Sequence, residues 1–257
     1  MSALDTVLDG VRSALADADR SVDALCRAAE AVLVGTGPGG TGPGGAGVAA
    51  LRASFDDVAD HLGGLLLAAG HPNALRAAGA AWVRDVGRPV SALIGALTDD
   101  VLDTGDRWTG PAADAYRAAF APQQLALSTV VAICQDVDSG FEELASAITS
   151  FWIAIGSACL GLVVALAGAL GSAATVVGVP ASTAIAAAGL SALFAAVKAA
   201  LDSLTEITSG AATHGVALRR RLGDSTAFPL EAWPRSTRAI GADASVTDGD
   251  GSDWQPR

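Results

Sequence analysis

Apolar residues recur at every third or fourth position through the first 34 residues, which is the spacing of one face of an α-helix. The stripe starts at Leu4 and continues to Val32, whereas the positions between its members carry charged side chains such as Asp9, Arg12 and Asp19. A helix with one apolar stripe and one charged face needs a partner on its apolar side. The pattern therefore predicts an amphipathic helix over residues 1–34.

A glycine-rich segment, GTGPGGTGPGGAG, follows at residues 35–47. Glycine gives the backbone freedom and the two prolines cannot continue a helix, so the segment is predicted to be a flexible linker. A phosphate-binding loop would require a preceding strand and a following Gly-Lys-Ser/Thr sequence, and the segment has neither.

Two further helices are expected after the linker, in a helical bundle that spans residues 48–152. The first has heptad spacing over residues 48–69. The second begins at Pro72, where the missing amide hydrogen would have no partner in any case, and we expect Pro89 to kink it. One side of this second helix carries the apolar residues Leu75, Trp82, Val86, Val90, Leu93, Leu97 and Val101.

The longest regular pattern in the chain lies in the next predicted helix, which begins at Pro111. Apolar and aromatic residues alternate there at spacings of four and three, as in a coiled coil, and such a seam requires an antiparallel neighbour. The helix that precedes Trp108 is the expected neighbour. The seam comprises Tyr116, Phe120, Gln123, Leu127, Val130, Cys134, Val137, Phe141, Leu144, Ile148 and Phe151.

No residue between Glu143 and Lys198 is charged. Pro180 lies near the middle of this stretch and divides it into two arms, 151–170 and 181–200, each about long enough to cross a bilayer. We therefore predict an uncharged, membrane-capable helical hairpin over residues 153–201, directly preceded by Phe151 and Trp152. The residues expected to form it are Phe151, Trp152, Leu162, Val163, Leu166, Pro180, Leu193 and Phe194.

Two interpretations of this hairpin remain open, insertion into a membrane and burial in a soluble bundle of alanine-rich helices. The aliphatic and aromatic side chains of the first arm favour insertion by roughly 3–5 kcal/mol, and those of the second by about 1.5–3 kcal/mol. Small residues repeat every fourth position from Ala184 to Ala200 and again from Gly161 to Ala169, which permits close helix packing in lipid.

The remaining sequence changes character twice. A short helix is predicted over residues 202–222, and residues 223–257 are predicted to form a disordered acidic tail because they are rich in Pro, Gly, Asp and Ser.

Composition supports an all-α fold of long antiparallel helical hairpins in a bundle. Hydrophobic residues make up 51% of the 257 residues and aromatic residues only 5%, and alanine, a strong helix former, dominates the apolar part. The net charge of −11 leaves little positive surface for phosphate backbones, so nucleic acid is not an expected partner. The N-terminal region lacks the basic stub and apolar block of a general secretory signal peptide.

The chain offers little evidence for catalysis. Cys26, Cys134 and Cys159 are each flanked by apolar helical sequence and have no histidine at ligand spacing, so we expect buried thiols, with no metal and no cofactor. Hydrolase, metalloprotease and Walker motifs are missing from the sequence, and the closely spaced glycines of residues 35–47 lack the preceding strand that a Rossmann motif requires. A non-enzymatic protein is therefore expected.

The string DRWTGPAADAYRAAF places Trp108 and Gly110 between two heptad helices, and HPNALRAAGAAWVRDV stands upstream. With these residues the sequence resembles the WXG family of type VII secretion substrates from actinobacteria, in particular the versions at the front of larger exported proteins. The resemblance covers about residues 71–152 and implies a hairpin with its turn at Trp108–Gly110. It also implies pairing with a second copy or a WXG-like partner, with Tyr116 as a further matching position.

The sequence departs from the WXG pattern in its export signal, because Phe120 stands where the family has an acidic residue four positions after tyrosine. Three functions are therefore carried forward. The first is a type VII substrate or accessory protein that acts by helix-bundle pairing. The second is a two-span membrane protein with a soluble docking domain, and the third is a membrane-perturbing effector. All three place the protein at a membrane or outside the cell.

Overall fold

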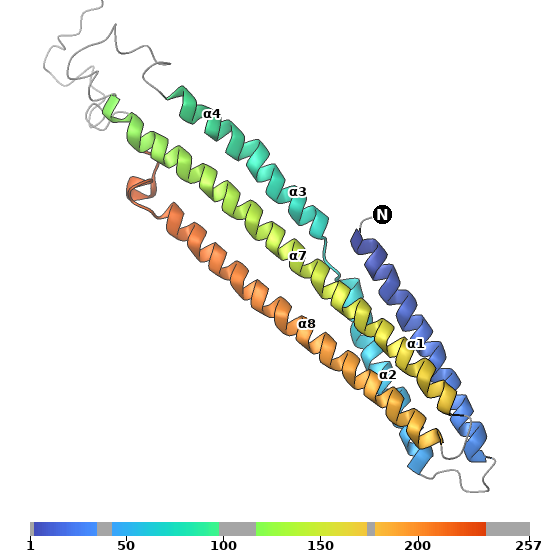
Figure 1. The fold of residues 1–257 in the computed structure, drawn as a ribbon. Coiled ribbons are helices and arrows are strands. Elements are labelled where there is room, and N and C mark those ends of the chain that lie inside the picture. Colours follow the sequence, from blue (N-terminus) through green and yellow to red (C-terminus); the bar gives the residue numbers. More distant parts are fainter. Residues whose placement is uncertain (1–2, 35–42, 98–116, 174–177, 235–257) are drawn as a thin grey trace, which may run out of the picture. The chain divides into compact units, whose positions relative to one another are not determined.

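The computed structural model describes residues 3–34, 43–97, 117–173 and 178–234, and all regular elements in these ranges are helices. The fold is therefore all-α, as predicted. Trp108, Gly110, Tyr116 and the expected helix start at Pro111 lie outside the described residues. The main helices are α1 (Ala3–Val34), α2 (Pro43–Leu67), α3 (Pro72–Trp82), α4 (Arg88–Ala96), α7 (Phe120–Ser172) and α8 (Gly178–Leu222) (Figure 1).

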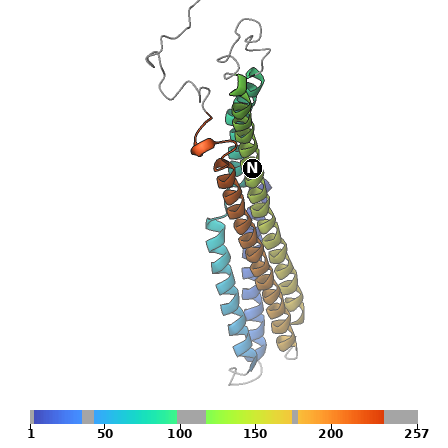
Figure 2. The same cartoon turned by 90° about the vertical axis from the view of Figure 1, so that its left-hand side faces the viewer.

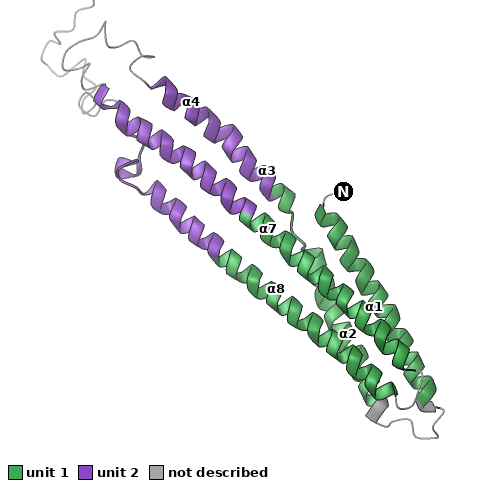
Figure 3. Cartoon of the chain, viewed as in Figure 1, with its two compact units in different colours: residues 1–74, 143–209 green, residues 75–142, 210–257 purple. Residues whose placement is uncertain are grey.

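The chain divides into two compact units, which Figure 3 distinguishes by colour. Unit 1 consists of residues 1–74 and 143–209, and unit 2 consists of residues 75–142 and 210–257. Helices α7 and α8 each contribute one part to each unit.

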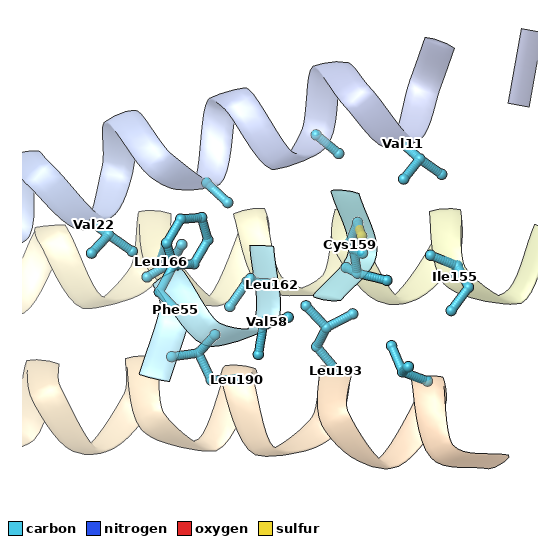
Figure 4. Packing of buried hydrophobic residues seen from close by; sticks show 14 of the residues in the cluster. Val11, Val22, Phe55, Val58, Ile155, Cys159, Leu162, Leu166, Leu190 and Leu193 are labelled. Carbon is cyan, nitrogen blue, oxygen red and sulfur yellow. The ribbon is translucent and has the colours of Figure 1, made fainter. Parts of the chain in front are cut away.

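Four helical segments pack together in unit 1. Helices α1 and α2 lie side by side (Figure 2), and the neighbouring parts of α7 and α8 form an antiparallel hairpin. All four segments contribute to one hydrophobic core, part of which Figure 4 shows from close by. The apolar stripe predicted for α1 is largely buried in this core, which includes Val11, Val22, Leu25, Phe55, Leu62, Trp152, Ile155, Leu166 and Leu193.

Several helix boundaries differ from those expected. Helix α2 begins at Pro43, inside the predicted linker, because proline is compatible with the first turn of a helix. Helix α7 continues through residue 152, where a domain boundary was expected, and α8 continues through residue 201 to Leu222. The seam of α7 and the uncharged arm therefore belong to one helix of 53 residues.

Between α2 and α3 the chain passes through a left-handed glycine. Gly70 has φ of +80°, a conformation that a side chain disfavours, and an added Cβ atom there would lie 3.3 Å from Cδ1 of Ile148. Pro72 then begins α3. The turn thus combines positive φ with close packing against α7.

In unit 2, α3 and α4 run antiparallel to the first part of α7. Nε of Arg76 lies 2.8 Å from a carboxylate oxygen of Glu142, and further along Nε2 of Gln124 donates a 2.6 Å hydrogen bond to the Leu97 carbonyl. Glu142, near the middle of α7, thus meets α3, whereas Gln124, near its start, meets the end of α4. The helix preceding residues 98–116 is therefore the neighbour of the α7 seam, as predicted.

A π-helical turn, η1 (Val83–Gly87), joins α3 to α4 directly before Pro89. Proline cannot donate a hydrogen bond and its ring crowds the preceding turn, and a widened turn accommodates both effects. The π-helical turn therefore allows the helix to continue past Pro89.

Two residues predicted for the apolar side of this helix are not buried. Trp82 is 47% exposed and Leu93 is 53% exposed, which corrects the expected face. The face that meets α7 instead contains Gly79 and Gly87, both of which are buried. An added Cβ atom at Gly79 would lie 3.0 Å from Cα of Asp138, so the helices approach through glycines that a hydrophobic pattern does not mark.

Residues 223–234, expected to belong to the disordered tail, have a defined conformation instead. Ala227 and Phe228 are buried and form a small cluster with Ala126, against which Val130 packs. The 3-10 turn η2 (Pro229–Glu231) follows, and the ring of Phe228 lies 6.3 Å from that of Trp233. Aromatic burial thus orders this segment, and the acidic residues beyond 234 lie outside the described part of the chain.

Candidate membrane-binding surface

The outward faces of α1 and α2 are charged and are joined to each other by Arg52. Its guanidinium lies 2.9 Å from Asp19 and 2.6 Å from Asp23 on α1, and 2.9 Å from Asp56 on α2. The hydrogen bond to Asp56 is the main cause that raises the pKa of Arg52 above its ordinary value. The same guanidinium lies 5.7 Å from the ring centre of Phe55. Arg52 therefore ties α1 to α2.

The face of the α7–α8 hairpin that meets α1 and α2, here called the inner face, is apolar. Trp152 is 2% exposed, and its Nε1–H donates a 2.9 Å hydrogen bond to the Ala69 carbonyl at the end of α2. The ring of Phe151 lies 5.1 Å from that of Trp152 in an edge-to-face arrangement. Of the residues predicted for the hairpin, the inner face buries Phe151, Trp152, Leu162, Leu166 and Leu193.

The opposite face of the hairpin, here called the outer face, is also uncharged but is exposed. On α7, Leu160 is 61% exposed, Val164 is 72% exposed, and Ile153 is exposed on the same stripe. On α8, Phe194 is 50% exposed and Ile185 is exposed too, but these two side chains lie about 180° apart around the helix. Large exposed apolar surfaces mark contacts with partners or with membranes. Of the other predicted residues, Val163 is half-buried and Pro180 is exposed.

The two arms of the hairpin touch at a glycine. An added Cβ atom at Gly189 of α8 would lie 2.8 Å from Cβ of Ala165 and 3.3 Å from Leu162 on α7. Contacts between small residues allow two helix backbones to approach closely, and in lipid such contacts hold helices together. The arms therefore make a pair whose packing does not depend on charge.

Two helices in the described part of the chain, α7 and α8, are long and apolar enough to cross a membrane. In each of them, only 28% of the most apolar 18-residue window is buried. The core helix of a soluble protein would be mostly buried, so the exposure of these windows is the distinctive property of the hairpin.

Unit 1 also contains a hollow of about 610 Å³ between the start of α1 and the turn after α2. Its ionisable lining residues are Asp5, Arg12 and His71, and its other walls are mainly aliphatic, including Leu4 and Leu67.

Groups suited to metal or thiol chemistry are not gathered in the described ranges. Within these ranges no three His, Cys, Asp or Glu side chains are placed to hold a metal ion. Cys134 and Cys159 are buried, and Cys26 is half-buried; all three are free thiols. Burial is the main cause that raises the pKa of the Cys26 thiol.

The residues of the predicted pairing seam are distributed over several contacts. Phe120 and Leu127 are buried, whereas Val130, Val137, Phe141, Leu144 and Ile148 are half-buried. Val130 packs against the cluster around Phe228, and Ile148 packs against Gly70 and the core of unit 1. The seam residues thus contact the segment around Phe228, the core of unit 1 and the helix that precedes residues 98–116, and only the last of these was predicted.

The two faces of the hairpin were not distinguished from the sequence, so the exposure of Ile153, Leu160, Val164 and Ile185 was not predicted. Helical spacing places Ile153, Leu160 and Val164 on one stripe, which was a usable indication. The sequence does not indicate which stripe faces α1 and α2, because neither face of the hairpin carries charge.

No protein-family model matches the chain, no curated protein is significantly similar to it in sequence, and no solved structure is significantly similar to it in fold. The function must therefore be inferred from the chemistry of the protein's own surfaces.

Proposed function

We propose that the protein acts at a lipid bilayer and that the α7–α8 hairpin of unit 1 is its membrane-inserting element. The observation that carries this proposal is the exposed, uncharged apolar surface of the hairpin, which includes Leu160 and Val164 on the outer face of α7 and Phe194 on α8. Each arm of about 20 residues rises by roughly 30 Å as a helix, which matches the hydrocarbon thickness of a bilayer. The inner face is uncharged too, so lipid can surround both arms.

A protein partner for the outer face is a weaker explanation. Interfaces between proteins have a polar rim and several hydrogen bonds around an apolar centre. Between Leu144 and Val197 the chain carries no charge at all, and its polar residues are Ser and Thr. Several of these hydroxyls already donate to carbonyls of their own helix, as Ser182 does to Val179 and Thr149 to Ala145. This composition suits hydrocarbon better than a wet protein interface.

The test is flotation of the purified chain with phosphatidylcholine vesicles, which are zwitterionic and do not repel a protein of net charge −11. The variant Leu160→Asp with Val164→Asp should lose binding at least tenfold, because each aspartate costs about 2.5–3.5 kcal/mol near the bilayer centre. Its circular dichroism should not change, since both positions are exposed.

The matched control is Leu93→Asp with Val216→Asp, which adds the same charge at exposed positions outside the hairpin. This control should float like the parent chain. A parent chain that stays unbound, or a Leu160/Val164 variant that floats normally, would contradict the proposal. Release of a trapped dye during binding would add membrane perturbation to the proposed activity.

A second candidate is a type VII secretion substrate of the WXG kind, which would act by helix pairing. The observation that favours it is the antiparallel pairing in unit 2 of the helices on either side of residues 98–116, supported by the Arg76–Glu142 ion pair. In an actinobacterial host, the protein should then reach the medium only while the type VII system is intact. Trp108→Ala should block that export, whereas Trp82→Ala should not.

A further inference from the structure

Helices α1 and α2 cannot follow the hairpin into a bilayer. Helix α1 carries charges along its length, from Asp5 to Glu30, and α2 carries Arg52, Asp56 and Asp57. One such charge at the centre of a bilayer costs about 2.5–3.5 kcal/mol, and the two helices carry many. The packed arrangement of unit 1 is therefore compatible with water but not with hydrocarbon.

The two helices are fastened to each other by electrostatic contacts that the hairpin does not share. Arg52 of α2 pairs with Asp19 and Asp23 of α1 and with Asp56 of its own helix. Toward the hairpin they present a different surface, in which small and aliphatic residues such as Val11 and Ala18 are fully buried. Apolar contacts of this kind can be replaced by lipid, whereas the ion pairs of Arg52 cannot.

The turn after α2 supplies a place where the two helices can swing away. Helix α2 ends at Leu67, and Gly70 adopts positive φ before Pro72 begins the next helix. Directly after α2, the Nε1–H of Trp152 donates a hydrogen bond to the Ala69 carbonyl. This hydrogen bond would have to break before α1 and α2 could separate from the hairpin.

We propose that α1 and α2 form a detachable cover, which separates from the hairpin as one body when the hairpin enters a bilayer and leaves both hairpin faces to lipid. This inference rests on the proposed membrane insertion. It adds that the buried inner face, with Trp152 and Leu162, is the second half of the lipid-contacting surface.

The test is a reversible lock between the cover and the hairpin. An added Cβ atom at Gly156 would lie 3.5 Å from Cγ2 of Val11, so cysteines at the two positions come close to the Cβ separation of roughly 3.5–4.5 Å that a disulfide requires. The lock is Val11→Cys with Gly156→Cys, in a full chain whose Cys26, Cys134 and Cys159 are replaced by alanine. The measurement is carbonate-resistant retention on phosphatidylcholine vesicles.

The oxidised lock should reduce retention at least tenfold, and dithiothreitol should restore it in the same sample. The reduced protein and the two single-cysteine variants are the matched controls. Equal retention of the oxidised and reduced forms would overturn the inference while leaving membrane insertion intact. A parent chain without retention would overturn both proposals.

A second measurement avoids changes in the core. Ser13 on α1 and Ser157 on α7 are exposed, so spin labels at Ser13→Cys and Ser157→Cys leave the packing unchanged. The distance between the labels, measured by pulsed electron resonance, should lengthen when vesicles are added. An unchanged distance in vesicle-bound protein would also overturn the inference.

Discussion

The two parts of helix α7 use one continuous backbone in opposite ways. Residues 120–142, in unit 2, combine a small apolar cluster with specific polar contacts, such as Glu142 with Arg76 and Gln124 with the Leu97 carbonyl. Residues 143–172, in unit 1, meet theirs through a dry core that contains Trp152 and Leu166. A hydrogen bond or an ion pair requires a donor and an acceptor at a narrow range of distances, whereas an apolar contact depends on the shape of its neighbour more than on its chemical identity.

This contrast shows that two parts of one continuous helix can make different kinds of contact. The polar half fixes which helix lies beside it and in which register. The apolar half has one face covered by α1 and α2, and this is the cover that we propose it exchanges for lipid. Four sets of substitutions test the contrast, from the largest expected effect to the smallest.

Trp152→Ala should remove more stability than any other single change considered. The side chain is almost fully buried and its Nε1–H is bonded to Ala69, so the free energy of unfolding should fall by about 3–5 kcal/mol in urea denaturation. Trp152→Phe keeps the apolar bulk but leaves the carbonyl unpaired, for a loss of about 1–3 kcal/mol. Trp82→Ala in unit 2, where the ring is half-exposed, should cost less than about 1 kcal/mol. Equal losses at both tryptophans would contradict the contrast.

Gly189→Ala and Gly79→Ala test the close helix contacts, one in each unit. The added methyl group meets Ala165 in unit 1 and the backbone of Asp138 in unit 2, so each change should cost about 1–3 kcal/mol. Gly161→Ala is the control, because no atom lies within 4 Å of the added carbon and alanine favours the helix by up to about 1 kcal/mol. Thermal unfolding followed by circular dichroism ranks the three; a destabilised Gly161 variant would show that the hairpin surface is not open.

Gly70→Ala tests the turn between α2 and α3. Alanine disfavours the left-handed conformation at φ of +80° by about 1–2 kcal/mol, and its methyl group would press on Ile148. Asparagine tolerates that conformation better, so Gly70→Asn should cost less. Gly64→Ala inside α2, with open space around it, serves as the reference in the same denaturation series. If all three variants were equally stable, the turn would not depend on glycine.

Arg52→Ala should have the smallest effect, about 1 kcal/mol, because the guanidinium is about one-third exposed and its ion pairs are partly screened by water. The loss should shrink in 1 M NaCl, where the screening length falls to about 3 Å. Measuring the free energy of unfolding at low and high salt separates these ion pairs from the packing of Arg52 over Phe55. A loss that is independent of salt would assign the effect to packing alone.

The sequence was sufficient to predict the helices themselves and much of the core. Regular spacing identified the buried stripe of α1, including Val11 and Val22, because the charged residues between its members contrast with it. The absence of charge likewise located the hairpin. In both cases the relevant property is a difference in polarity between residues, which can be read from the residue types alone.

The remainder depended on shape and on distant partners. Gly79 and Gly87 lie on the face that meets α7. Because glycine is not counted as a hydrophobic residue, the hydrophobic pattern instead predicted a face that includes Trp82 and Leu93, which are exposed. The burial of Phe228 against Ala126 joins segments about a hundred residues apart, which local spacing cannot reveal. The two faces of the hairpin could not be distinguished because both are apolar.

The order of the helices along the chain has a consequence for synthesis. The ribosome makes α1 and α2 before the uncharged arms of α7 and α8. At about 5–20 residues per second, α2 is complete roughly 4–17 s before the first arm emerges, which exceeds the time that helix formation takes. The nascent hairpin therefore meets a waiting partner of its own chain, which shields it from aggregation while translation continues.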